Sequence, residues 1–120
     1  MDHVICHFEI PADEPEALAK FYTQLFGWKI EKMPGFPDYY GIRPSADEQA
    51  LGGGMMKRQS PQQGPINYVL VESVSDYLRK AESLGAMTVV PKTEIPGMGW
   101  FALILDPQHN PFGLFESAPK

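Results

Sequence analysis

The feature that most constrains the fold is an order of elements that occurs twice: a strand, a helix, and then three short strand-like segments. In the first half, residues 4–10 alternate apolar and polar side chains, as a half-buried strand does. The helix that follows carries apolar residues at helical spacing and ends at Gly27. In the second half, residues 66–71 predict the strand, and the helix follows between Ser73 and Gly85. The sequence therefore predicts two β-α-β-β-β modules.

Clusters of Pro and Gly separate these elements, so they mark boundaries within a fold. Asp13 followed by Glu16 has the pattern of a capping box and predicts the start of the first helix. Three strand-like segments follow each helix, at residues 28–32, 39–43 and 51–57 and then at 87–91, 100–105 and 112–117. The polar stretch 59–64 predicts a linker between modules at about 1–58 and 65–120.

One helix per module can cover only one face of its strands, so the other face needs the second module, a partner chain or a ligand. We therefore expect an α+β fold in which the two tandem modules form an open, curved mixed sheet with a central cleft. Such a cleft is the usual kind of site for a small molecule. Because 120 residues is one domain's worth of chain, residues 1–120 are expected to form a single domain.

Composition excludes several classes of function. Ten basic against fifteen acidic residues give a net charge of −5, which argues against a nucleic-acid partner. Apolar runs fall short of the roughly 18 residues that a membrane span needs, and the first ten residues lack the pattern of a signal peptide. The single cysteine, Cys6, cannot form an internal disulfide, and its place on the apolar side of a strand predicts a buried, inert thiol. The expected location is the cytoplasm.

Four segments together resemble a known superfamily: HFEIPADEPEALAKFYTQLFGW at 7–28, VSDYLRKAESLGA at 74–86, IPGMGWFALILDP at 95–107 and DPQHNPFGLFE at 106–116. The resemblance is to the vicinal oxygen chelate superfamily, which includes glyoxalase I, bleomycin-resistance proteins and extradiol dioxygenases. Within it, the chain is most similar to the small glyoxalase-like proteins of bacteria. The resemblance implies the paired-module fold described above and a homodimer.

The resemblance also implies a metal site, which this sequence retains only in part. In the family, four protein groups hold a metal that activates a substrate with two neighbouring oxygens. Alignment on Phe21–Tyr22 places the first ligand position at His7 and its counterpart in the second module at Ile66. The usual glutamate of the last strand falls on Gly113, and the remaining position falls in 51–56, which has no acid, His or Gln. One of four positions is retained, so we expect the metal site to be largely lost.

Two functions remain open from the sequence. The leading hypothesis is a protein that binds a small, partly apolar ligand in the cleft, oriented by His7, Glu9 and Tyr68, with no cofactor. The later strands supply aromatic side chains, about half of which should face the helices or a dimer partner instead of the ligand: Tyr39, Tyr40, Trp100 and Phe112. Of these, Tyr40, Trp100 and Phe112 are our predicted ligand contacts. A structural role limited to dimerisation is a third, weaker hypothesis.

The alternative is an enzyme, namely a lyase, isomerase or dioxygenase acting on a substrate with neighbouring oxygens. It would need a divalent metal on His7 together with substitute carboxylates, because one imidazole cannot hold such an ion against water. Glu9 shares a strand face with His7, and Glu72 lies at the end of the second opening strand. Glu116 has the opposite parity from Gly113, so it would need a bulge to face inward. The absence of a carboxylate at Gly113 favours binding over catalysis.

Overall fold

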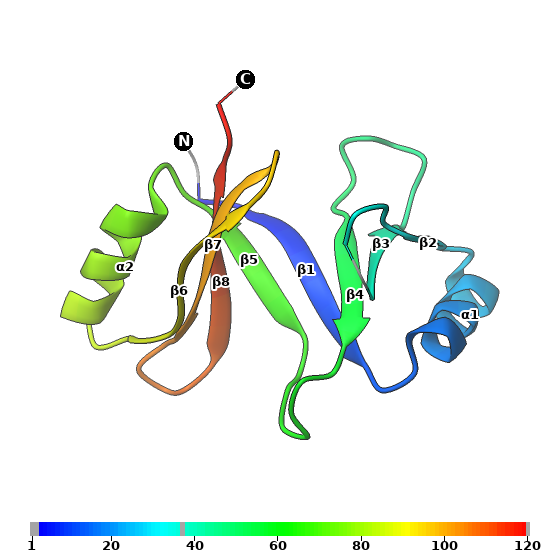
Figure 1. Cartoon of the computed structure of the whole chain (residues 1–120), viewed down its shortest axis with the longest axis horizontal. Coiled ribbons are helices and arrows are strands. Elements are labelled where there is room, and N and C mark those ends of the chain that lie inside the picture. Colours follow the sequence, from blue (N-terminus) through cyan, green and yellow to red (C-terminus); the bar gives the residue numbers. More distant parts are fainter. Residues whose placement is uncertain (1–2, 37, 120) are drawn as a thin grey trace. The chain divides into compact units, whose positions relative to one another are not determined.

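The computed structural model describes residues 3–36 and 38–119, and within these ranges it contains two helices and eight strands (Figure 1). In chain order the elements are β1 Ile5–Ala12, α1 Pro15–Phe26, β2 Lys29–Lys32, β3 Tyr39–Arg43, β4 Gly53–Lys57, β5 Ile66–Leu70, α2 Val74–Ser83, β6 Met87–Ile95, β7 Gly99–Leu105 and β8 Pro111–Ser117. The predicted α+β class and the repeated order of elements are confirmed. Across the described ranges, no helix has the length and apolar character needed to cross a membrane.

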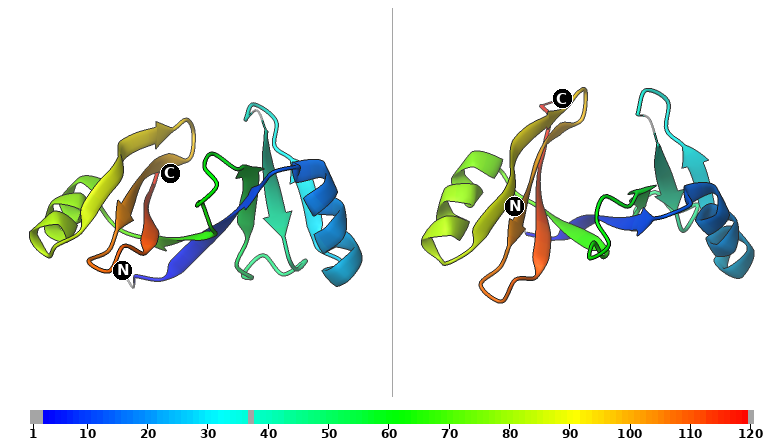
Figure 2. Two further views of the ribbon diagram at one scale, coloured as in Figure 1. Left: turned by 90° about the horizontal axis from the view of Figure 1, so that it is seen from below. Right: turned by 60° about the horizontal axis from the view of Figure 1, so that its bottom comes forward.

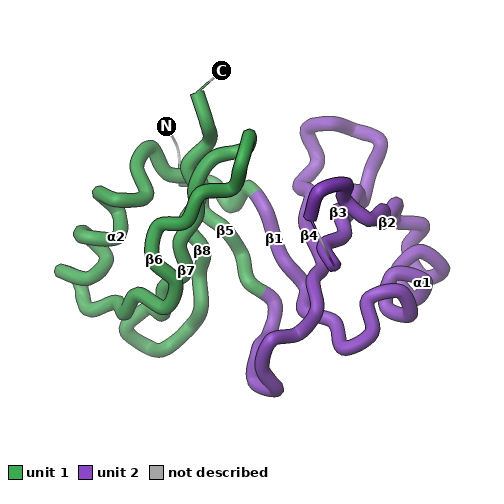
Figure 3. Tube along the Cα trace, in the orientation of Figure 1, with its two compact units in different colours: residues 1–6, 66–120 green, residues 7–65 purple. Residues whose placement is uncertain are grey.

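The chain forms two compact units (Figure 3): unit 1 contains residues 1–6 and 66–120, and unit 2 contains residues 7–65. The strand order is β2-β3-β4-β1 in unit 2 and β6-β7-β8-β5 in unit 1. In each unit the opening strand pairs in parallel with the last strand, and the other neighbours pair antiparallel. The two units therefore share one topology, as expected for tandem modules.

In unit 2, α1 packs on one face of the strands, and Figure 2 shows it lying along that face. The buried centre of this layer is Ala12, Ile42 and Met55. Alternation along β1 sends Phe8 and Ile10 into the same layer. His7 and Glu9, which alternate with these two along β1, point to the opposite side of the strands, which we name the His7 face of unit 2.

In unit 1, α2 packs on one face of its strands in the same way (Figure 2). The buried residues there are Val71, Val74, Ala102 and Leu114. Tyr68 lies on the opposite face, where its ring centroid is 6.4 Å from that of Phe101. We name this side the Tyr68 face of unit 1.

The start of α1 differs from the prediction. Pro15 is the first helical residue and Glu14 is the N-cap, with no side-chain hydrogen bond to the helix amides. Asp13 instead accepts a hydrogen bond from Arg58 Nε at 3.0 Å, so the predicted capping box does not form. The fixed φ of Pro15 suits the first turn of a helix and places the helix start after Asp13. The predicted end is confirmed, because Gly27 closes α1 in the left-handed region with φ of 75°.

The start of α2 follows the prediction. The Ser73 side chain accepts a hydrogen bond from the Asp76 amide at 3.1 Å. Glu116 of β8 adds a second cap, since its Oε1 accepts from the Val74 amide at 2.9 Å. A carboxylate beside a helix N-terminus also interacts favourably with the helix dipole. Glu116 therefore points to the α2 side, as its parity relative to Gly113 predicted, and its charge serves the helix.

Candidate functional site

Three polar side chains meet on the His7 face of unit 2. His7 Nε2 lies 2.9 Å from the Tyr39 hydroxyl oxygen, and that hydroxyl donates a hydrogen bond to Glu9 Oε2, also at 2.9 Å. The direct distance between His7 Nε2 and Glu9 Oε2 is 4.0 Å. The His7 side chain is 35% exposed and that of Glu9 is 12% exposed. The cluster is therefore partly buried and still reachable from solvent.

Strand alternation explains why these residues meet. His7 and Glu9 are two residues apart on β1, so their side chains leave the strand on the same side. Tyr39 opens β3, and its neighbour Tyr40 packs into the layer under α1. Tyr39 must then point to the His7 face, because successive side chains of a strand point to opposite sides.

A glycine in β4 makes room for the Tyr39 ring. Gly54 pairs with Glu9 on one side and with Gly41 of β3 on the other. A Cβ built at Gly54 would lie 2.7 Å from Cε1 of Tyr39 and closer still to its Cζ and hydroxyl oxygen. The space that a β4 side chain would fill is thus taken by the end of the Tyr39 side chain. The close approach requires glycine at this position.

The hydrogen bonds define where the hydrogens lie. A phenol hydroxyl carries one hydrogen, and Tyr39 directs it to the Glu9 carboxylate. The hydrogen between the Tyr39 oxygen and Nε2 must therefore come from His7. This assigns the neutral imidazole of His7 to the Nε2–H tautomer.

Burial shapes the electrostatics of the cluster. Burial lowers the pKa of the His7 imidazole, and the attraction of the Glu9 carboxylate opposes that shift. Burial raises the pKa of the Tyr39 phenol, and the negative charge of Glu9 and the hydrogen bond to it act in the same direction. Both shifts favour the neutral forms of His7 and Tyr39 at neutral pH. The cluster therefore presents polar hydrogens and not a phenolate.

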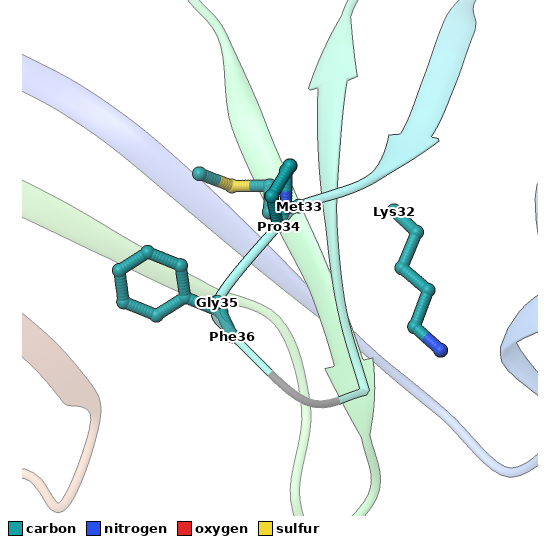
Figure 4. A pocket seen from close by; sticks show the side chains of 5 residues that line it. All are labelled: Lys32, Met33, Pro34, Gly35 and Phe36. Atoms are coloured by element: carbon teal, nitrogen blue, oxygen red, sulfur yellow. The ribbon is translucent and has the colours of Figure 1, made fainter.

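Apolar side chains lie beside the cluster. A Cβ at Gly41 would be 3.6 Å from Met33 Cγ and Sδ, which places the Met33 side chain on the His7 face next to Tyr39. A shallow, open hollow of about 440 Å³ lies against the loop after β2 and is lined by 32–36 (Figure 4). Figure 4 shows the Met33 and Phe36 side chains on one side of the ribbon and Lys32 on the other. His7, Glu9 and Tyr39 do not line this hollow, so the polar cluster lies outside it.

The residues present do not fit a four-donor metal site. In the described ranges 3–36 and 38–119, no three or more His, Cys, Asp and Glu side chains are grouped closely enough to hold a metal ion. His7 Nε2 directs a hydrogen, not a lone pair, toward the Tyr39 hydroxyl oxygen. At Gly113 a Cβ would lie 2.6 Å from Cγ of Tyr68 and closer to two other ring carbons. The last-strand position, Gly113, is thus covered by a tyrosine ring, and so is Gly54 within the 51–56 stretch.

The predicted ligand residues divide between the two sides of the strands. His7 and Glu9 come together on the His7 face of unit 2. Tyr68 lies on the Tyr68 face of unit 1, only 6% exposed and packed over Gly113. The other three predicted contacts are on the helix sides, because Tyr40 packs in the α1 layer, Trp100 packs in the α2 layer, and Phe112 alternates with Gly113 on β8. These three join neither the cluster of His7, Glu9 and Tyr39 nor Tyr68.

Tyr39 is the site residue that the sequence did not single out. The sequence offered it only as one of four aromatic residues in the later strands. Two adjacent tyrosines begin β3, and the sequence alone did not decide which of them faces His7. The available signal was Gly54, since a buried glycine in a strand indicates that another group approaches closely.

Comparison with known proteins gives a family match over most of the chain. Residues 7–115 match the family model described as a glyoxalase-like domain. Two curated relatives, from Mycobacterium tuberculosis and Mycobacterium bovis, each bear the name of a candidate glyoxylase, CFP32. Each is 25% identical over 114 residues, which cover 91% of this chain and 44% of the relative. The chain therefore spans less than half the length of these relatives.

Solved structures with the same fold include two methylmalonyl-CoA epimerases and a dioxygenase. The Mycobacterium tuberculosis epimerase has a TM-score of 0.66 at 15% identity, with 94% of this chain and 87% of that chain covered. The Streptomyces coelicolor epimerase has a TM-score of 0.69 at 11% identity, with 96% of this chain and 97% of that chain covered. The 2,3-dioxygenase LapB from Pseudomonas sp. KL28 has a TM-score of 0.61 at 16% identity, with 96% of this chain and 42% of that chain covered. At these identities the similarity shows the fold alone.

Proposed function

Because the chain belongs to the glyoxalase-like domain family, we propose that it binds a small, partly apolar molecule on the His7 face of unit 2, without a resident metal. The observation that carries the proposal is the hydrogen-bonded cluster of His7, Tyr39 and Glu9, which is partly exposed on the side of the strands opposite α1. This position is where strand alternation would present side chains to a ligand and not to the core.

The chemistry of the cluster supports a ligand with a hydroxyl or carbonyl oxygen. The three side chains are joined by two hydrogen bonds. An oxygen atom of a ligand can take the place of one partner in such a bond, so that no polar group of the cluster is left without a hydrogen bond. Met33 offers apolar contact area beside Tyr39. A few placed polar groups within an apolar surface are the common composition of small-molecule sites.

A ligand screen with matched variants tests the proposal. Wild-type protein would be screened by thermal shift against catechols and thiol adducts of 2-oxoaldehydes, and hits would be measured by calorimetry. We expect binding to fall about two- to tenfold in Tyr39→Phe, which loses one neutral hydrogen bond worth about 0.5–1.5 kcal/mol, and to fall also in Glu9→Gln, whose amide oxygen is a weaker acceptor than the carboxylate. Tyr40→Phe is the control, because it removes the same atom one residue away, on the α1 side. Hits that bind equally to all four proteins would place the ligand elsewhere.

The competing function is metal-dependent catalysis on His7 with substitute carboxylates. His7 and Glu9 are close enough, at 4.0 Å, for this to be tested directly. Elemental analysis of untagged protein, purified without chelator, distinguishes the two functions. Near-stoichiometric metal that is lost in His7→Ala would contradict metal-free binding and favour a lyase, isomerase or dioxygenase.

A further inference from the structure

Two oxygens of the polar cluster are spaced like two atoms of a carbonyl compound that can lose a proton. The Tyr39 hydroxyl oxygen and Glu9 Oε2 are 2.9 Å apart. In a ketone or aldehyde, the carbonyl oxygen and the neighbouring carbon are about 2.4 Å apart, from bond lengths of about 1.2 and 1.5 Å. Such a molecule can therefore place its oxygen at the hydroxyl and its neighbouring carbon at the carboxylate at the same time.

We propose that the His7 face of unit 2 removes a proton from the carbon next to a carbonyl group, with Glu9 as the base and the Tyr39 hydroxyl as the donor to the carbonyl oxygen. The inference rests on the proposed function and deepens it. It names the class of ligand, a small ketone or aldehyde with a hydrogen on that carbon, and it names the reaction. A carboxylate base beside a neutral hydroxyl donor is a combination that suits this chemistry.

The atoms and electrons balance within the cluster. The C–H bond breaks, its proton goes to Glu9 Oε2, and its electron pair forms an enolate with negative charge on the former carbonyl oxygen. The Tyr39 hydroxyl, which donates to Glu9 in the resting cluster, turns its hydrogen to that oxygen. The same turn releases Glu9 Oε2 from its hydrogen bond with Tyr39. Return of a proton from Glu9 to the carbon completes the cycle, so no oxidant or reductant is needed.

His7 supports the hydroxyl as a donor. Its Nε2–H points at the Tyr39 oxygen from 2.9 Å, and a hydroxyl that accepts one hydrogen bond becomes a stronger donor in another. Burial and the Glu9 charge raise the pKa of the Tyr39 phenol, so it keeps its hydrogen at neutral pH. Glu9 and Tyr39 are therefore the catalytic residues of the proposal, and His7 is a positioning residue.

The surroundings favour a charge that develops during the reaction. The Glu9 side chain is only 12% exposed, and Met33 lies next to Tyr39. The end of the Tyr39 ring lies over Gly54, where a Cβ would overlap it, so the hydroxyl is held in place. A donor that is already in position stabilises a developing negative charge more effectively than water, which must first reorient.

Deuterium exchange at carbon tests the proposal. The protein is incubated in deuterium oxide with hydroxyacetone or α-hydroxyacetophenone, with EDTA present, and proton NMR follows the signal of the hydrogens next to the carbonyl. We expect wild type to exchange them faster than buffer does, and Glu9→Gln to return the rate to that of buffer. Tyr39→Phe should slow exchange by about a hundredfold or more. Tyr40→Phe is the matched control and should behave as wild type, because Tyr40 packs on the α1 side.

Calorimetry with the same probes separates catalysis from binding. At saturating probe, Tyr39→Phe should lose far more rate than affinity, and a loss of rate no larger than the loss of affinity would contradict a catalytic role. His7→Gln, whose amide N–H can replace Nε2–H, should keep more of the rate than His7→Ala. Circular dichroism and thermal unfolding establish that each variant is folded.

Three results overturn the proposal: wild type that accelerates exchange of neither probe, Glu9→Gln that exchanges as fast as wild type, or exchange that EDTA abolishes. A probe that binds on this face without exchange contradicts this inference and leaves the proposed function standing. Exchange that persists unchanged in both Glu9→Gln and Tyr39→Phe, together with unchanged binding, contradicts both.

Discussion

Gly113→Ala should be strongly destabilising for so small a change. Gly113 pairs directly with Tyr68 across β5 and β8, and both are buried. An added Cβ would lie 2.6 Å from Cγ of Tyr68 and closer to two further ring carbons, against an ordinary contact of at least 3.4 Å. The atoms in the way belong to the base and middle of the ring, so a rotation at its far end does not relieve the overlap.

The expected magnitude follows from overpacking a buried site. Such changes cost about 1–3 kcal/mol, and the depth of the overlap puts Gly113→Ala at the upper end, about 2–3 kcal/mol. For a chain of this size that lowers the melting temperature by about 8–12 °C. Urea unfolding followed by circular dichroism measures the free energy directly. Gly64→Ala is the control, because nothing lies within 4 Å of a Cβ there.

A double-mutant cycle with Tyr68→Ala isolates the cause. If the ring is what the new methyl group meets, Gly113→Ala should cost less than about 0.5 kcal/mol in the Tyr68→Ala background. An unchanged penalty of 2–3 kcal/mol in that background would refute the reasoning, as would a Gly113→Ala protein as stable as wild type. The cycle also bears on the metal site, because a glutamate at Gly113 meets the same ring.

Three further outcomes follow from the structure. Ser73→Ala should lower the free energy of unfolding by about 1 kcal/mol, because the Asp76 amide loses its acceptor. Asp13→Ala should lower the free energy of unfolding by less than about 1 kcal/mol in the same urea assay, because Asp13 forms an exposed ion pair with Arg58 and caps no helix. A larger loss would indicate that Asp13 caps α1 after all. Asp106→Asn should change how the stability of the protein depends on pH. Backbone and side-chain hydrogen bonds lower the pKa of Asp106, so its stabilisation is present above the ordinary value near 4 and is lost as the pH falls through the lower folded value. Melting temperatures should therefore differ from wild type at pH 7 and converge near pH 2, and parallel curves would contradict this.

Local pattern was sufficient for most of the fold. Alternation along β1 correctly separated His7 and Glu9 from Phe8 and Ile10, because a strand with one face in a core must repeat every two residues. Gly27 ended α1 as expected, since a left-handed residue stops a helix with little strain in glycine. The start of α1 was misplaced because Asp13 had a competing partner, Arg58, 45 residues away. Local sequence holds no information about such a partner.

The sequence by itself determined the class of fold and the order of elements, because short-range periodicity and turn residues carry both, and four segments of it carried the resemblance to the family. It also determined that His7 and Glu9 share a face. Only the tertiary structure decided that Tyr39, and not Tyr40, joins them. That choice depends on the register of β3 against β4, which pairs Tyr39 with Met56 and Gly41 with Gly54. A slip of one residue would exchange the two tyrosines between the core and the site, and it is disfavoured by the packing of Ile42 and Tyr40 in the α1 layer and by the room for the Tyr39 ring at Gly54.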